Sequence, residues 1–157
     1  MRSTALVYIC NPNNPTGSIT SRKATEEFIR KLPTGVLVLI DEAYHHYVGE
    51  SSMYASFIDH PLEGDRVIVT RTFSAVYGLA GLRLGYGIAS PKLAEQMRAF
   101  CTANTVNTVA LQAGIEALAD TEAVRAFVKR NADDRQEFFN QAMARMSSRW
   151  QMVHWLW

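Results

Sequence analysis

The first half of the chain carries four short runs of apolar and β-branched residues, a pattern typical of strands. They cover residues 5–10, 36–41, 67–72 and 85–89. The first three runs are almost continuously apolar, which predicts strands buried on both faces, as in a parallel sheet.

Helical signals lie between and after these strands. One segment begins with polar residues and ends before Pro33, and Pro91 marks the first turn of another helix. The predicted helices cover residues 21–32, 52–58, 91–100, 107–118 and 122–146. The resulting order is a βαβαββ core followed by helices, which indicates an α/β fold.

Composition narrows the class of protein. The chain has 157 residues, 48% of them hydrophobic, which suits one globular domain with a substantial core. Its 16 basic and 15 acidic residues form no charged block, so nucleic acid and membrane surfaces are not expected partners. Cys10 and Cys101 do not suggest a disulfide framework, and we expect free thiols in a cytoplasmic protein.

Three polar motifs follow the first three predicted strands. Residues 11–17 read Asn-Pro-Asn-Asn-Pro-Thr-Gly, residues 41–44 read Asp-Glu-Ala-Tyr, and residues 72–75 read Thr-Phe-Ser-Ala. A glycine-rich stretch with Arg83 comes after the third motif. Ligands of open α/β sheets bind beyond the carboxyl ends of the strands, so these motifs are candidates for one binding site.

In this order and spacing, the motifs resemble the fold-type I, pyridoxal-phosphate-dependent aminotransferases of the histidinol-phosphate aminotransferase type. The resemblance implies a three-layer part of the large domain, with helices on both faces of a mixed, mostly parallel sheet of about four strands. The strands would lie in the order fourth, third, second, first, with the fourth antiparallel. Residues 1–148 would be a truncated central part of that cofactor-binding domain, and residues 149–157 a tryptophan-rich tail unlike the family.

The resemblance also implies roles for individual residues. Asn14 and Tyr44 would bind the phenolic oxygen of pyridoxal phosphate, and Asp41 would bind its ring nitrogen. The expected phosphate ligands are Thr72, Ser74 and Arg83. The Asn14–Pro15 bond is a candidate for the cis form, because such bonds are nearly confined to proline.

Ala75 stands where the family has the lysine that forms the Schiff base. Alanine has no amine, so we expect weak, non-covalent binding of pyridoxal phosphate and no normal transamination. Two alternatives stay open. One is hydrolysis of activated esters in the vacant pocket, with Ser74 and His45, and the other is a non-catalytic, engineered or oligomerising module.

The expected partners are a second copy of the chain, bound through exposed sheet edges, and a small amine or amino acid. No metal site is expected. His45 and His46 are adjacent on an extended segment and would point to opposite sides, and no third ligand has suitable spacing.

Overall fold

The structure is a computed structural model that describes residues 4–49, 51–102 and 105–145. The tail predicted at residues 149–157 lies outside these ranges. The strands are β1 (Leu6–Cys10), β2 (Leu37–Asp41), β3 (Val67–Thr72) and β4 (Gly85–Ala89). The helices are α1 (Arg22–Lys31), α2 (Pro91–Arg98), α3 (Thr108–Ala119) and α4 (Thr121–Arg145), with two short 3₁₀ turns, η1 (His45–Tyr47) and η2 (Ala80–Leu82).

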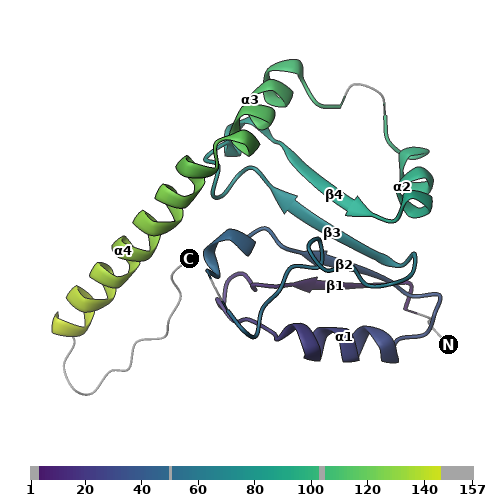
Figure 1. Cartoon of the computed structure of the whole chain (residues 1–157), viewed down its shortest axis with the longest axis horizontal. Coiled ribbons are helices and arrows are strands. Elements are labelled where there is room, and N and C mark those ends of the chain that lie inside the picture. The colour runs from purple at the N-terminus through teal and green to yellow at the C-terminus, as the bar shows by residue number, and fades with distance from the viewer. Residues whose placement is uncertain (1–3, 50, 103–104, 146–157) are drawn as a thin grey trace.

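The four strands form one mixed sheet in the order β1–β2–β3–β4 (Figure 1). β1, β2 and β3 run parallel, and β4 is antiparallel to β3. The predicted α/β class, strand order and strand directions are therefore confirmed. The register sets Cys10 beside Asp41, and Asp41 beside Thr70, so the carboxyl ends of β1, β2 and β3 meet at one edge.

One face of this sheet packs against α1. Alternate residues of β2, Val38 and Ile40, are almost fully buried and form a core cluster with Ile29 of α1 and Val69 of β3. Burial of each such side chain contributes roughly 1.5–3 kcal/mol. The Ser21 hydroxyl begins α1 by accepting the N–H of residue 24, so the polar start predicted from the sequence is a helix cap.

The opposite face is less covered. Leu6 and Tyr8 of β1 point to this side and are 51% and 57% exposed. The prediction that β1 is buried on both faces is wrong, because no element within the described residues packs closely enough on this side to bury them. Continuous apolarity in β1 reflects a strand with one open face.

The later helices pack around β4 and the turn before it. α3 approaches closely at Gly114, where an added Cβ would lie 2.5 Å from Leu84 and 3.5 Å from Phe73. α4 extends away from the sheet as one long helix, and none of its described residues is buried (Figure 1). No helix within the described residues is both long and apolar enough to cross a membrane.

Four of the predicted helices are confirmed to within two residues at each end, and all four strands to within one. The helix predicted at residues 52–58 does not form. There, long-range partners take the backbone groups that a helix would use: Phe57 donates its N–H to Glu42, and Ser56 gives its carbonyl oxygen to Arg22. The observed order is therefore βαβββ, with a loop and η1 between β2 and β3.

Candidate functional site

The three motifs that follow β1, β2 and β3 leave the sheet at the same edge. Because the parallel register aligns the strand ends, Asn14, Asp41 and Thr72 all lie at or just beyond this edge. Tyr44 and Ser74 follow within three residues of their strand ends. This is the position at which open α/β sheets bind ligands.

Asn14 and Tyr44 are in direct contact. The Asn14 Nδ2 donates a hydrogen bond of 2.8 Å to the Tyr44 hydroxyl, across 30 residues of sequence. The Asn14–Pro15 peptide bond is cis, as predicted, and so is the Asn11–Pro12 bond. The structure thus brings together the two side chains that the resemblance assigns to one ligand oxygen.

Asp41 is the last residue of β2, and both of its carboxylate oxygens are engaged. Oδ1 accepts the backbone N–H of Ala43 at 3.0 Å, and Oδ2 accepts the Tyr8 hydroxyl at 2.8 Å. The hydrogen bond to Asp41, and then burial, raises the pKa of Tyr8. Tyr8 was not among the predicted site residues. Strand alternation could have found it, because it lies two residues before Cys10, the register partner of Asp41.

Thr72 and Ser74 form a short hydroxyl-bearing turn at the end of β3. The Ser74 backbone N–H donates to Thr72 Oγ1 at 3.0 Å. Ala75 follows in a tight turn, in which its carbonyl oxygen accepts the N–H of Gly78 at 2.9 Å. Gly78 has a φ of +67°, a left-handed conformation that glycine adopts without steric cost.

Arg83 lies after η2 and is turned toward its own turn. Its Nη1 donates to the Ala80 carbonyl oxygen at 2.9 Å, and its backbone is left-handed, with a φ of 51°. That conformation costs a non-glycine residue roughly 1–2 kcal/mol. Among the described residues, no hydrogen bond joins Arg83 to the other predicted phosphate ligands, Thr72 and Ser74.

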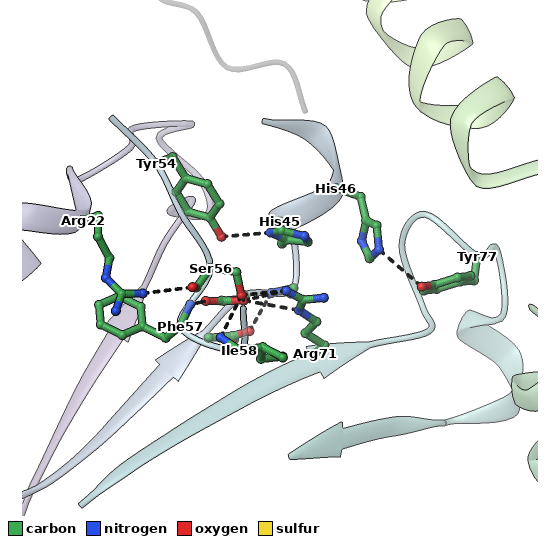
Figure 2. Close-up of polar contacts among 12 residues, drawn as sticks. Arg22, His45, His46, Tyr54, Ser56, Phe57, Ile58, Arg71 and Tyr77 are labelled. Atoms are coloured by element: carbon green, nitrogen blue, oxygen red, sulfur yellow. Dashed lines mark hydrogen bonds and ion pairs between the residues drawn. The ribbon is translucent and has the colours of Figure 1, made fainter. Parts of the chain in front are cut away.

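A buried polar cluster lies on the other side of the strand from Asp41, and sequence reasoning missed it. Glu42 Oε2 accepts the Ser56 hydroxyl at 2.6 Å and Arg71 Nη2 at 3.0 Å, while Oε1 accepts the Phe57 N–H at 2.7 Å. Arg71 also donates to the Ser56 hydroxyl at 2.8 Å. Figure 2 shows Ser56 and Phe57 lying beside Arg71 in this cluster. The available signal was a charged residue within the third apolar strand, Arg71, and a second one of opposite sign, Glu42, directly after the second strand.

Two adjacent histidines link this cluster to the neighbouring loops. His45 Nδ1 lies 3.3 Å from the Tyr54 hydroxyl, and the Tyr77 hydroxyl lies 3.3 Å from His46 Nε2 (Figure 2). The extended segment expected for the two histidines is wrong, since they lie in the 3₁₀ turn η1. The Glu42 carbonyl accepts the His45 N–H and starts this turn.

Burial keeps both imidazoles in their neutral form near neutral pH. Burial, and then the nearby Arg71, lowers the pKa of His45. Burial, and then His45 and Arg71, lowers the pKa of His46 to about 4. Neutral rings can accept a hydrogen bond at one nitrogen and donate at the other.

The arrangement does not favour a Ser–His hydrolase. Across residues 4–49, 51–102 and 105–145, no hydrogen bond joins His45 to Ser74, and His45 is paired with Tyr54 instead. A general base must reach the hydroxyl that it activates. The ester-hydrolysis alternative therefore gains no support from this geometry.

The donor set at the sheet edge suits the ligand implied by the resemblance. A carboxylate can hold a protonated ring nitrogen, and an amide and a phenol that already touch can flank a phenolate oxygen. Hydroxyls and a guanidinium suit phosphate. Asp41, Asn14 and Tyr44 lie at one edge with the carboxylate oriented by Tyr8, so the residues present fit this ligand.

Comparison with known proteins assigns the family. The model of the family "Aminotransferase class I and II" matches residues 2–154, nearly the whole chain. The chain belongs to this aminotransferase family.

Curated members of the family carry related sequences. Histidinol-phosphate aminotransferase 2 of Carboxydothermus hydrogenoformans is 41% identical over 143 residues, which are 91% of this chain and 39% of that protein. An aromatic amino acid aminotransferase of Cutibacterium acnes is 37% identical over 141 residues, which are 88% of this chain and 39% of that protein. The chain thus spans about two fifths of the length of these relatives.

Solved aminotransferases share the fold. The histidinol-phosphate aminotransferase of Sinorhizobium meliloti, solved in complex with pyridoxal-5'-phosphate, superimposes with a TM-score of 0.78 at 32% identity. The match covers 85% of this chain and 36% of that one. The enzyme of Clostridium acetobutylicum gives a TM-score of 0.74 at 25% identity, over 87% of this chain and 42% of the other. Pyridoxal phosphate is therefore the cofactor of this aminotransferase family.

Proposed function

We propose that this aminotransferase-like chain binds pyridoxal phosphate without a covalent bond and does not carry out normal transamination. The observation that carries the proposal is the meeting of the Asn14–Tyr44 pair and the Asp41 carboxylate at one edge of the sheet. When bound, pyridoxal phosphate supplies an aldehyde and an electron-withdrawing ring.

Each side chain has a defined part in this proposal. Asp41 holds the proton on the ring nitrogen, and the Tyr8 hydroxyl keeps the carboxylate oriented. Asn14 and Tyr44 donate to the phenolic oxygen. Thr72, Ser74 and Arg83 bind the phosphate. Because one Nη1–H of Arg83 already donates to the Ala80 carbonyl, the guanidinium would bind the phosphate through its other N–H groups.

Residue 75 decides the chemistry. The resemblance puts Ala75 at the position of the family lysine, and a methyl group can neither bond to an aldehyde carbon nor take a proton from a substrate. Binding then depends on hydrogen bonds and charge alone. The names of the relatives include both histidinol-phosphate and aromatic amino acid aminotransferases, so the expected amine partner is an amino acid or related amine.

The test is equilibrium binding of pyridoxal phosphate and pyridoxamine phosphate by calorimetry. We expect saturable binding of both, and Asp41→Asn should weaken it by about 10- to 100-fold, because a charged hydrogen bond contributes roughly 1.5–3 kcal/mol. Asp133→Asn, on the exposed surface of α4, is the matched control and should leave the affinity for both compounds unchanged. Equal affinity in the Asp41 and Asp133 variants would refute the proposed site.

Self-association through the sheet edges belongs to the same proposal. β1 and β4 end the sheet order, and Leu6 and Tyr8 expose apolar surface beside the β1 edge. Unpaired edge strands offer hydrogen-bonding groups to another chain. We expect a dimer or higher oligomer in sedimentation equilibrium. A monomer at every concentration would exclude self-association through the sheet edges.

A further inference from the structure

We propose that Glu42, Arg71 and Ser56 form a buried positioning cluster that sets the placement of Asp41 and Tyr44. The consequence for ligand binding rests on the proposed function, but the positioning itself is a property of the ligand-free protein. None of the three is expected to touch a ligand, because they lie on the far side of the strand from Asp41.

The cluster is almost closed to solvent, and both carboxylate oxygens of Glu42 accept hydrogen bonds. The side chains of Glu42 and Arg71 are 1% and 11% exposed, and Ser56 is also buried. The Glu42 carboxylate accepts hydrogen bonds from a hydroxyl, a guanidinium and a backbone N–H. So many partners, drawn from β3 and from residues 56–57, hold this carboxylate in one place.

The backbone transmits this placement to the site. Glu42 is bonded to Asp41 and begins the turn that leads to Tyr44. Its N–H donates to the Thr70 carbonyl at 2.9 Å, and its own carbonyl accepts the His45 N–H at 3.1 Å. Residues 41–45 are thus held at the backbone and at the Glu42 side chain, so Asp41 and Tyr44 have little freedom to turn away.

A second support holds the segment to which Glu42 binds. Arg22, the first residue of α1, donates to the Ser56 carbonyl at 2.9 Å and to the His60 carbonyl. Its guanidinium carbon lies 3.6 Å above the centre of the Phe57 ring (Figure 2). Two partners of Glu42, Ser56 and Phe57, are therefore anchored to a helix of the core, as a rigid positioning group requires.

A buried ion pair is weak evidence for a role in stability alone. Well-packed apolar residues often replace such a pair without loss of stability, whereas removal of one partner leaves a buried charge. Exchange of both charged residues for apolar ones therefore distinguishes a stabilising role of the pair from a positioning role. A pair that only stabilises can be exchanged for apolar side chains with no effect on the site, but a pair that positions cannot.

The experiment compares Glu42→Met/Arg71→Met with the parent protein. In the ligand-free state, we expect the NMR signals of the Asn14 side-chain amide and the Tyr44 ring to shift or broaden while the fold is retained. Affinity for pyridoxamine phosphate should fall on the order of 10-fold or more, because small displacements of positioned groups carry such costs. Glu42→Asp, which keeps the charge but withdraws it by one methylene, provides the same readouts if the double variant does not fold.

Arg66→Met is the matched control. Arg66 also holds a segment in place, the end of α1, by donating to the carbonyls of Ile29, Leu32 and Pro33, but it lies at the opposite end of the sheet. It should lower stability and leave the Asn14 and Tyr44 signals unchanged. Unchanged signals in the folded Glu42 variants would overturn the positioning role. If the parent protein binds no pyridoxamine phosphate, the proposed function fails, while the NMR comparison still decides the positioning role.

Discussion

Acid should destabilise this protein through His46. Its folded-state pKa is about 4, below the ordinary value of 6.5, because the ring is partly buried and lies near His45 and Arg71. Between these values the unfolded chain binds a proton that the folded chain does not, so the free energy of unfolding falls as pH falls. The contribution is fully present above pH 6.5 and is lost on the way to pH 4.

The size of the effect follows from the pKa difference. At roughly 1.4 kcal/mol for each unit of pKa difference, the full lowering of the pKa of His46 would correspond to about 3 kcal/mol in the free energy of unfolding. The ring is only partly buried, and solvent screening reduces this to about 1–2 kcal/mol. His45, whose pKa is also lowered by burial, acts in the same direction.

Urea unfolding at pH 7.0 and pH 4.5 measures this difference. His46→Gln keeps a hydrogen-bonding group for Tyr77 but cannot titrate, and it should reduce the loss of stability by about 1–2 kcal/mol. The matched control is His60→Gln, which makes the same exchange on the exposed surface. If His46→Gln loses as much stability as the parent protein, the account of His46 is wrong.

Three further outcomes are expected. Ile40→Ala, at a core position that is 1% exposed, should lower the free energy of unfolding by about 2–5 kcal/mol in urea titrations, and a loss below 1 kcal/mol would contradict the packing. Gly114→Ala should destabilise by about 1–2 kcal/mol despite its better helix propensity, because the new methyl would lie 2.5 Å from Leu84; a rise in melting temperature would contradict the close approach. Asn14→Ala removes a donor to Tyr44 and should weaken pyridoxal phosphate binding about 3- to 10-fold in calorimetry, whereas unchanged affinity would separate this pair from the site.

The sheet could be predicted because its information is local. Apolar runs, Pro33 and the caps at Ser21 and Asn107 mark element ends within the sequence itself. The order of the strands came from the family resemblance, which the motifs at the strand ends supported. The contact of Asn14 with Tyr44 followed from the same source.

The buried polar cluster and the missing helix at residues 52–58 could not be predicted, because both depend on contacts between residues far apart in the sequence. The Glu42–Arg71 pair joins residues 29 positions apart, and no periodicity indicates which charged residue in a strand finds a buried partner. The same cluster takes the N–H of Phe57 and so prevents the helix predicted there. The open face of β1 also escaped prediction, because an apolar strand has the same composition whether or not another layer covers it.

The most direct test of the proposed pyridoxal phosphate site introduces an amine at residue 75. Ala75→Lys is incubated with pyridoxal phosphate, reduced with borohydride and digested for mass spectrometry. The account predicts a pyridoxyl group on the new lysine at residue 75 and none on the parent protein's peptide covering that residue. If the new lysine is modified no more than Lys129 on the exposed surface of α4, then Asp41, Asn14 and Tyr44 do not hold the cofactor beside residue 75, and the central claim fails.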